Sequence, residues 1–583
     1  MGLPGLLDAF AGGTTMHGVP KAIKARSSFG RAFWSVVCLA AASIFCFQFA
    51  QLLRKYYSYP KKVSIEILPL AVPFPAISVC NMRNLDIIVL NKLNDIFKRE
   101  TNNLTAQNLT DNQFINEYLK TASKYRPMVL LPDVDREMFQ TVLTRTTFAT
   151  NINRDIIATG GVPFKEFIVT CRFGGHPCNR TQDFKHLFDP YYYNCYTYEA
   201  PTTRVPESSL AEGLENGWST TVLTGSGMLD RNENIRIIPG THEYLSPMSS
   251  SEGVRVVIHP PNTEPYPHTE GFDLPPGYSV SFGVRARQTI RIGAPHGNCS
   301  PSNPFGDRGK QYRLISCQKM CLQRAIVDKC GCRDIALPGY DQYPATVFCN
   351  DDSVLPDYCR ENATDECLDA VKVIYARIMC VKDTTVDTTR NTSAILDCGC
   401  HPPCNEISYD VTYSLSKWPA ESFDGEEAYI DIFHAENYPA RFTGPEDAEK
   451  IELYGNYFDP SNRRRAMQDF ARLNVYIADS NVLKTEESED YVQSQLLSDL
   501  GGQLGLWVGI SVITIVEILE LVVDLFRFLS TRHGPYSRGS TFSRDPEPKH
   551  PDDVCQKCEH CNGIRTTWFD SFVSFGMLQN AWG

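Results

Sequence analysis

Two long apolar runs lie near the ends of the chain, and a long, mostly polar stretch separates them. The first run, Ala32–Leu53, contains no charged residue, and the second, Leu504–Leu529, is uncharged as far as Val516. About 20 apolar residues in a helix cross ~30 Å of hydrocarbon. The pattern therefore predicts two transmembrane helices. The predicted regions are 1–31, a cytoplasmic N-terminus; 32–53, the first span; 54–495, an extracellular domain; 496–529, the second span; and 530–583, a cytoplasmic tail.

The second run carries three acids, Glu517, Glu520 and Asp524. Their offsets of three and four place them on one face of a helix. A carboxylate that faces lipid at mid-membrane costs about 2.5–3.5 kcal/mol, so these acids should face water or protein. The interpretation is a pore wall shared by several copies. If the helix is continuous, the same face also carries Gly509, Gly505, Gly502 and Ser498.

Two other interpretations of this segment remain open. Gly501, Gly505 and Gly509 make overlapping GxxxG spacings, which alone favour helix packing over a pore. Ion pairs could also neutralise the acids, but the nearest basic residue in the segment is Arg527. Ser511 does not fall on the acidic face of a continuous helix. We therefore predict that Gly509–Ser511 interrupt the helix and leave backbone carbonyls free to line a constriction.

The stretch between the spans is predicted to be extracellular and disulfide-rich. A chain of 583 residues is too long for one core, and the formal charge of −12 argues against a nucleic-acid partner. Of its 21 cysteines, 16 lie between the spans, an even number that suits eight disulfides in an oxidising compartment. Both termini are then cytoplasmic in a plasma-membrane protein without a cleavable signal peptide. The 16 are Cys80, Cys171, Cys178, Cys195, Cys299, Cys317, Cys321, Cys330, Cys332, Cys349, Cys359, Cys367, Cys380, Cys398, Cys400 and Cys404.

Glycosylation sequons support the same orientation. Several Asn-x-Ser/Thr sites in one region that also holds paired cysteines indicate a secretory environment. A poorer site at Asn298 has Cys299 as its middle residue. The predicted glycosylation sites are Asn103, Asn108, Asn179, Asn362 and Asn391.

The extracellular stretch is mostly β in its pattern. Aromatic and β-branched runs predict strands, and Pro275–Gly277 predicts a turn. Polar amphipathic stretches predict three helices. The expected strands are 191–197, 254–259, 279–286 and 472–478, and the expected helices are 85–99, 133–145 and 463–471.

The run GGQLGLWVGIS, followed by EILEL, resembles the second span of the degenerin, epithelial sodium channel and acid-sensing channel family. FPAISVCN (Phe74–Asn81) is similar to the family's strand motif after the first span, and His17-Gly18 to its gating motif near the inner pore. The resemblance implies a trimeric, sodium-selective channel whose selectivity filter is Gly509, Ile510 and Ser511. It also implies block by amiloride near Gly505 and a gate position at Ser498, where a bulky side chain holds the pore open.

The same resemblance implies the fold. The expected class is an α+β membrane protein with two transmembrane helices. Between them lies a disulfide-rich domain with a β-rich palm and β-ball and helical finger, thumb and knuckle elements. The nine cysteines from Cys317 to Cys404, excluding Cys349 and Cys380, are similar to the ladder of disulfides that stiffens the thumb. Trp418 is expected to anchor the thumb to the membrane-proximal wrist.

Within that family, the segments LGLWVGIS, GVRVVIHPP, FDLPPGYS and RKY look most like the invertebrate FMRFamide-gated sodium channels. Acid-sensing members usually carry alanine where this chain has Ile510. The expected ligand is an extracellular amidated neuropeptide bound in an aromatic-lined cleft, with contact residues left unassigned. The alternatives are a proton-gated or constitutively open channel of the same family, or a non-conducting glycosylated receptor or adhesion protein.

Enzyme chemistry is not expected. Gly509-Ile510-Ser511 lacks the second glycine of a nucleophile elbow, and there is no P-loop, HExxH or dinucleotide-binding pattern. No cofactor is expected beyond the permeant sodium ion. Two groups of cysteines have spacings that could hold zinc. At Cys398-x-Cys400 disulfides are favoured over zinc, and the second group is in the tail, at Cys555, Cys558 and Cys561 with His560. No metal site is predicted.

Overall fold

The computed structural model describes residues 3–69, 72–99, 111–200, 212–225, 251–306, 309–390, 397–420, 441–442, 447–457 and 467–532. The chain divides into two compact units. The terminal unit comprises residues 1–42 and 504–583, and the central unit comprises residues 43–503.

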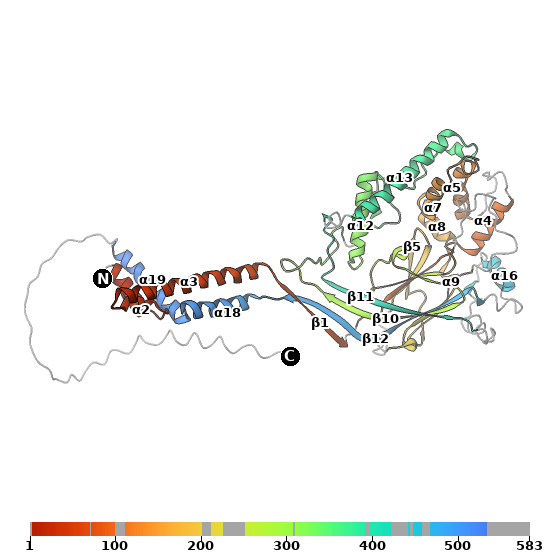
Figure 1. Cartoon of the computed structure of the whole chain (residues 1–583). Helices are drawn as coiled ribbons and strands as arrows, with labels where there is room; N and C mark the ends of the chain where they lie inside the picture. The colour runs from red at the N-terminus through yellow and green to blue at the C-terminus, as the bar shows by residue number, and fades with distance from the viewer. Residues whose placement is uncertain are drawn as a thin grey trace, which may run out of the picture. The chain divides into compact units, whose positions relative to one another are not determined.

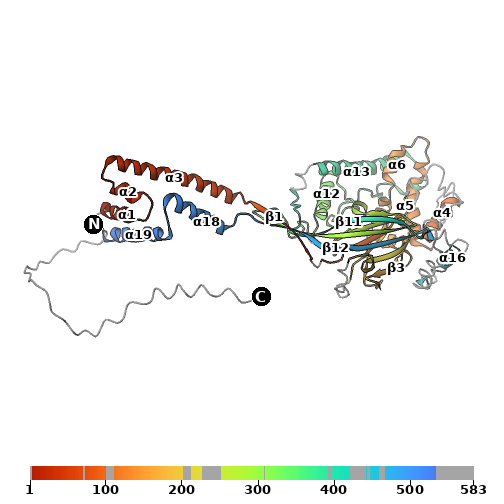
Figure 2. The ribbon, with the colours of Figure 1, turned by 60° about the horizontal axis from the view of Figure 1, so that its bottom comes forward.

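A seven-stranded sheet forms the base of the central unit. Its strand order is β11-β10-β12-β7-β3-β4, and β1 pairs with β12. Strands β10 and β12 are parallel, and β11, β10 and β12 run side by side in both views (Figures 1 and 2). The strands are β1 (Lys61–Pro69), β3 (Ile168–Phe173), β4 (His176–Pro177), β7 (Trp218–Leu223), β10 (Tyr278–Ile290), β11 (Asn405–Lys417) and β12 (Phe470–Glu489).

Buried and exposed side chains alternate along these strands, so the sheet has one buried face and one open face. On β12, Leu473, Val475 and Ile477 are buried, whereas Arg472 is exposed and Asn474 is half-buried. Successive side chains of a strand point to opposite faces, so this pattern buries one face and leaves the other polar. The buried face packs with residues such as Trp218 and Phe282 of neighbouring strands.

A five-stranded sheet, ordered β5-β6-β2-β8-β9, packs on the buried face of the seven-stranded sheet. Its central strand β2 is buried at every position, and the Cys80–Cys195 disulfide joins β2 to β6. A continuous apolar strand of this kind needs cover on both faces. The strands are β2 (Ala76–Asn81), β5 (Phe184–Asp189), β6 (Tyr193–Tyr198), β8 (Val254–His259) and β9 (Phe272–Leu274).

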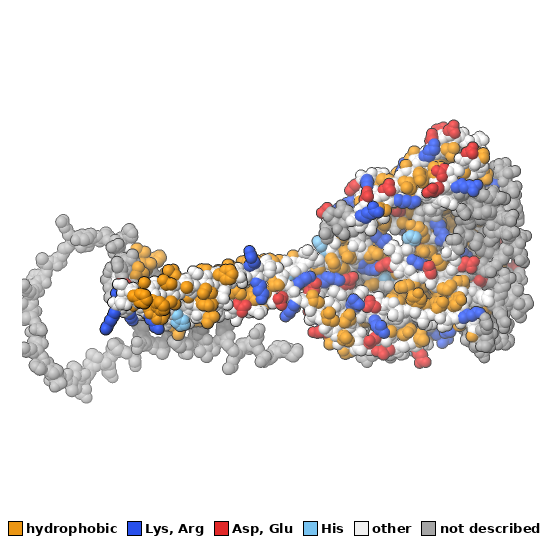
Figure 3. Space-filling model, viewed as in Figure 1, with side chains coloured by type: hydrophobic (Ala, Val, Ile, Leu, Met, Phe, Trp, Pro, Cys, Tyr) orange, Lys and Arg blue, Asp and Glu red, His pale blue; other side chains and the backbone are white. Residues whose placement is uncertain are grey.

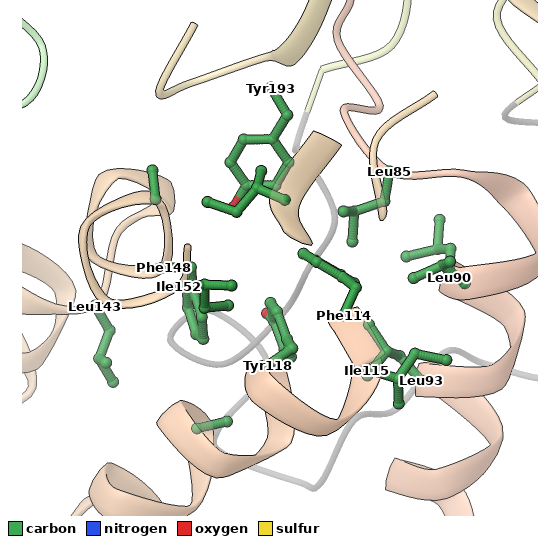
Figure 4. Close-up of a cluster of buried hydrophobic side chains, with 14 of the residues drawn as sticks. Leu85, Leu90, Leu93, Phe114, Ile115, Tyr118, Leu143, Phe148, Ile152 and Tyr193 are labelled. Atoms are coloured by element: carbon green, nitrogen blue, oxygen red, sulfur yellow. The ribbon is translucent and has the colours of Figure 1, made fainter. Parts of the chain in front are cut away.

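Short helices build a second hydrophobic core. Figure 4 shows Leu90, Phe114, Tyr118 and Phe148 pointing toward one another, and the Tyr118 and Phe148 rings stack with centroids 4.2 Å apart. The helices of this part are α4 (Ile87–Arg99), α5 (Gln113–Val129), α6 (Arg136–Val142), α7 (Arg145–Asn151), α8 (Arg154–Gly160) and α16 (Ala448–Tyr457). The short helix α9 (Phe164–Phe167) packs in the core of the sheets instead.

Disulfides hold the two long helices α12 (Leu314–Cys330) and α13 (Asp365–Arg390). All 16 cysteines between the spans pair, which confirms the eight predicted disulfides, and the zinc alternative at Cys398 and Cys400 is excluded because both are bonded. Cys38 and Cys46 are free thiols, and the tail cysteines lie outside the described residues. The pairs are Cys80–Cys195, Cys171–Cys178, Cys299–Cys404, Cys317–Cys400, Cys321–Cys398, Cys330–Cys380, Cys332–Cys349 and Cys359–Cys367.

Several shorter elements lie between and beside these helices and strands in sequence. They are η2 (Leu214–Asn216), α11 (Pro267–Glu270), η4 (Tyr340–Gln342), η5 (Asp357–Arg360) and α18 (Gln493–Gln503) in the central unit, and α1 (Leu3–Gly13), α2 (Val19–Lys24), the π-helical turn η9 (Leu504–Val508) and α19 (Val512–Arg532) in the terminal unit. Helix α3 (Ser28–Tyr57) runs through the boundary between the units.

Two segments are apolar enough to cross a membrane. One is helix α3, with a mean hydropathy of 2.1. The other consists of Gln493–Val508 and Val512–Arg527, two helical pieces bent by 77° at the residues between them. Apolar side chains of α3, including Val36, Leu39 and Phe47, are exposed. Figure 3 shows hydrophobic side chains along the spans, whereas acidic and basic side chains intermix on the visible face of the central unit.

All four predicted strands are present, whereas two predicted helices and the predicted place of Trp418 need correction. Residues 463–466 of the predicted helix 463–471 lie outside the described residues. The end of this prediction is wrong, because Phe470 and Ala471 are already in β12, where both are buried. The predicted helix 133–145 is shorter, since α6 ends at Val142. Trp418 is not at the wrist: it follows β11 at the end that pairs with Tyr278, and it packs on the helical core.

A buried charge cluster fastens α16 to the rest of the central unit. Lys450 of α16 contacts Asp86 and lies 2.8 Å from Glu166, which also contacts Arg83. Burial acts to raise the pKa of Glu166, but Lys450 and Arg83 hold it below its ordinary value. Burial, with Glu166 beside it, raises the pKa of Asp86.

Replacing Lys450 with methionine is expected to lower the free energy of unfolding by about 3–5 kcal/mol, because it leaves buried carboxylates without their cation. Thermal unfolding of the purified chain measures this. Lys92→Met is the control, because the Lys92–Glu449 pair at 2.8 Å has half-exposed side chains and contributes about 0–1 kcal/mol. Equal losses in the two variants would contradict the role of the buried cluster.

Candidate ion pore

The second apolar segment is interrupted at Gly509–Ser511. The π-helical turn η9 ends at Val508, α19 begins at Val512, and Gly509 has a φ of +71°. Only glycine adopts this left-handed backbone without cost. The predicted interruption of the helix is therefore present.

The break leaves two carbonyl oxygens available. Ile510 N donates to Leu504 O at 3.2 Å, and Ile515 N donates to Ser511 O at 3.1 Å. Within the described part of the chain, the carbonyl oxygens of Gly509 and Ile510 accept no hydrogen bond. Irregular backbone at membrane depth needs water, protein or an ion as a partner. These oxygens can therefore coordinate a cation.

The break also contradicts the prediction that Gly509, Gly505, Gly502 and Ser498 follow the acids along one face of a continuous helix. Glu517, Glu520 and Asp524 share a face of α19, but Gly509 is not helical and residues 504–508 form a π-helical turn. A π-helix has more residues per turn than an α-helix, so a count of 100° per residue does not carry across it. The glycines and Ser498 cannot be assigned to the acidic face by counting.

Small residues before the break leave open space. A Cβ added at Gly501, Gly502 or Gly505 would meet no described atom within 4 Å. Within one copy, therefore, no described helix packs on the GxxxG glycines. Ser498 is exposed on α18, so a larger side chain fits there without a clash inside the subunit.

His17 and Gly18 lie directly against the break. His17 N donates to Val508 O at 3.2 Å, and a Cβ on Gly509 would lie 2.4 Å from His17 Cγ. Gly18 has a φ of +83° and starts α2, and a Cβ there would lie 2.7 Å from Cys38 Sγ. A side chain at Gly509 would therefore push the His17 segment away from the break, whereas one at Gly18 would strain the backbone and collide with the Cys38 side chain.

Glu517 is held by the chain's own N-terminal segment. Its Oε2 accepts hydrogen bonds from Thr14 Oγ1 and Thr15 N, each at 3.0 Å, and from Thr15 Oγ1 at 3.3 Å. Thr514, which is fully buried, is 2.6 Å from Thr15 Oγ1 and bonds to Ser511 at the start of α19. The network links the N-terminus, the break and the first acid of α19.

The other two acids are differently placed. Glu520 is exposed and makes no ion pair with a described residue, and Asp524 lies 3.8 Å from Arg527 across an exposed helical turn. Such an exposed pair contributes little to stability. Glu520 and Asp524 therefore remain open to water or to a neighbouring copy, whereas Glu517 has partners in its own chain.

Sequence reasoning missed Thr14, Thr15 and Thr514. Thr514 lies three residues before Glu517, a spacing that puts both on one helical face, and Thr14-Thr15 come just before His17-Gly18. The spacing of Thr514 was a usable signal. The contact between segments about 500 residues apart was not readable from the pattern.

Three of the five predicted glycosylation sites, Asn103, Asn108 and Asn391, lie outside the described residues. Asn362 is exposed. Asn179 is half-buried, and its side chain accepts a hydrogen bond from Thr181 Oγ1 of the same sequon at 2.8 Å. These two side chains lie on the surface, as glycosylation would require.

The central unit contains a large charged cavity of 1040 Å³ between α4, α8 and α16. The apolar part of its lining comes from Ile88, Val89 and Ala448. The buried charge cluster lies at its edge, since Lys450 and Asp86 also line it. Lys92 and Lys165 are paired with Glu449 and Asp447, whereas Asp95 and Asp111 have no ion-pair partner among the described residues. The cavity therefore favours a cationic ligand.

The comparisons with known proteins agree with this geometry. The family model described as "Amiloride-sensitive sodium channel" matches residues 10–521. The FMRFamide-activated amiloride-sensitive sodium channel of Cornu aspersum is 27% identical over 561 residues, covering 90% of this chain and 84% of its own length. The epithelial sodium channel subunit beta of Bos taurus is 25% identical over 597 residues, covering 89% and 82%, and the degenerin-like protein asic-1 of Caenorhabditis elegans is 32% identical over 366 residues, covering 62% and 36%.

The matched region contains the span α3, the disulfide-bonded sheets and the break at Gly509–Ser511. The members of this family are ion channels of the plasma membrane, not enzymes. This chain belongs to the amiloride-sensitive sodium channel family, which includes the degenerins and the epithelial sodium channels.

Proposed function

We propose that this chain forms a sodium-selective, amiloride-sensitive channel of the plasma membrane, opened by an extracellular amidated neuropeptide. The observation that carries the peptide assignment is the match to a protein whose name records activation by FMRFamide, over 90% of this chain and 84% of that one. The assembly is a homotrimer with both termini cytoplasmic. Gly505 is the proposed region of amiloride block.

Sodium is proposed to cross the break. The free carbonyl oxygens of Gly509 and Ile510, repeated by each subunit, replace water around the ion, and Ser511 completes the filter. Glu520 and Asp524 add a negative potential below it. His17 and Gly18 brace the break, so their segment takes part in gating.

The peptide is proposed to bind in the charged cavity beside α16. The letters of FMRFamide include an arginine, and amidation removes the C-terminal carboxylate, so the peptide is cationic. Asp95 and Asp111 supply unpaired carboxylates for it. The lining residues described there are charged and aliphatic, whereas an aromatic-lined cleft was expected.

The cavity is connected to the strands that lead to the spans. Asp86 follows β2, and Glu166 lies on α9 directly before β3, so closing the cavity acts on both sheets. Strand β12 continues to Glu489, pairs there with Lys61 of β1, and precedes α18. A peptide that stabilises one arrangement of α16 can therefore shift the population of conducting states.

Voltage-clamp recording in oocytes tests the proposal, with FMRFamide-like peptides and acid perfused separately. We expect an amiloride-blocked sodium current with peptide alone, and about tenfold weaker peptide sensitivity for Asp95→Asn and Asp111→Asn, or ~1.4 kcal/mol each. Glu449→Gln, whose carboxylate is already paired, is the control. Current at low pH alone would favour the proton-gated alternative, and no current under any stimulus would favour a non-conducting receptor.

A further inference from the structure

The open face of the seven-stranded sheet contains a second hollow, of 540 Å³, where β3, β7, β10 and β12 lie side by side. It is lined by polar side chains of all four strands. The ones that matter here are Arg172, Ser219, Ser279, Ser281, Arg472 and Asn474.

Strand register explains why these residues share one face. Arg172 of β3 pairs with Ser219 of β7, which pairs with Asn474 of β12, which pairs with Ser281 of β10. The next row pairs Arg472 with Ser279. Register partners project to the same side of a sheet, so short hydroxyl side chains form the floor between two arginines.

The two guanidinium groups have no counter-ion in the described part of the chain. Arg172 and Arg472 are exposed, and neither makes an ion pair with a described residue. Glu215 is the one carboxylate among the described lining residues, and it is not within ion-pair distance of either arginine. The lining thus has a net charge of +1, on a chain whose formal charge is −12.

The floor offers hydrogen-bond donors. Asn474 Nδ2 donates to Ser279 Oγ at 3.3 Å and to Ser281 Oγ at 3.2 Å. Because each serine oxygen accepts from the amide, its own hydrogen is free to point into the hollow. Ser219 adds a third hydroxyl. Three hydroxyl groups therefore line a hollow that is also lined by two guanidinium groups.

We propose that this hollow is a binding site for a small oxyanion from solution, held by Arg172 and Arg472 with the serine hydroxyls beneath. Guanidinium forks match carboxylate and phosphate oxygens in geometry and charge. A bound anion bridges β3 and β12, and β12 is the strand that continues toward α18. A bound anion therefore stabilises the sheet at β12, the strand that lies nearest the second apolar segment in sequence. This effect does not depend on which ligand opens the channel.

Thermal unfolding of the purified full chain in lipid nanodiscs tests the site, with inorganic phosphate as the probe and chloride at the same ionic strength as the reference. We expect a saturable rise in Tm with phosphate. Arg172→Gln and Arg472→Gln should each raise the phosphate concentration at half-effect at least tenfold. Ser281→Ala, a milder change that leaves the fold intact, should raise it about threefold.

Arg285→Gln is the matched control, because Arg285 is an exposed arginine of β10 that does not line the hollow. Its response to phosphate should equal that of the unmodified chain. A Tm rise that persists in both arginine variants would show a general ion effect and overturn the site. No saturable rise in the unmodified chain would also overturn it, and is the outcome expected if a carboxylate of a neighbouring copy fills the hollow.

Discussion

Replacing Gly509 with alanine is expected to reduce sodium current at least tenfold while the protein still reaches the cell surface. Alanine at a φ of +71° costs about 1–2 kcal/mol in the backbone alone. Its Cβ would also lie 2.4 Å from His17 Cγ and 2.7 Å from His17 N. Because that nitrogen is a backbone atom, the clash cannot be relieved by a side-chain rotation. The His17 segment must then leave the break, and its hydrogen bond to Val508 O is lost.

Whole-cell current and surface labelling measure this effect together. Gly13→Ala is the control, since an added Cβ there meets nothing within 4 Å and its backbone is not left-handed. It should conduct as the unmodified channel does. Normal current from Gly509→Ala at normal surface level would show that the fit between His17 and the break does not matter for conduction.

Thr15→Val and Glu517→Gln are expected to be strongly non-additive. Thr15 Oγ1 bonds to Glu517 Oε2 and to the buried Thr514, so valine keeps the shape and removes both bonds. A hydrogen bond to a charged group contributes about 1.5–3 kcal/mol. Each single change should therefore shift the activating concentration about tenfold or more, and the double change should do little more than the larger single one.

A double-mutant cycle on activation curves measures this coupling, which we expect at about 0.5–3 kcal/mol. The matched cycle pairs Thr15→Val with Glu520→Gln, because Glu520 makes no hydrogen bond to a described N-terminal residue. That pair should be additive. Additivity in both cycles would mean that Glu517 acts in the pore alone and does not hold the N-terminal segment.

The sequence predicted the first apolar helix, the disulfide-rich body and the break because each has a local signal. An uncharged apolar run, an even set of cysteines and a Gly-x-Ser ahead of acids can be read without knowing which segments meet. The strand 254–259 was predicted to the residue, since its β-branched run has clear limits at Gly253 and Pro260.

The predictions that failed depended on contacts between distant segments or on irregular backbone geometry. Phe470 and Ala471 look helical beside a charged run, but burial in the sheet overrides that local preference. The count from Glu517 back to Ser498 failed because the π-helical turn changes the angle per residue. The hydrogen bonds of Thr14 and Thr15 to Glu517 needed the fold, because no pattern links residues so far apart.

Residues 509–511 are proposed to line the sodium path, and Ser511→Cys would place a reactive thiol in it. Single-channel recording before and after reaction with a cationic thiol reagent, with the unmodified chain treated alike because Cys38 and Cys46 are free thiols, measures unitary conductance and the sodium-to-potassium reversal potential. We expect that labelling sharply lowers the unitary conductance and shifts the reversal potential. A labelled channel with both quantities unchanged would contradict it.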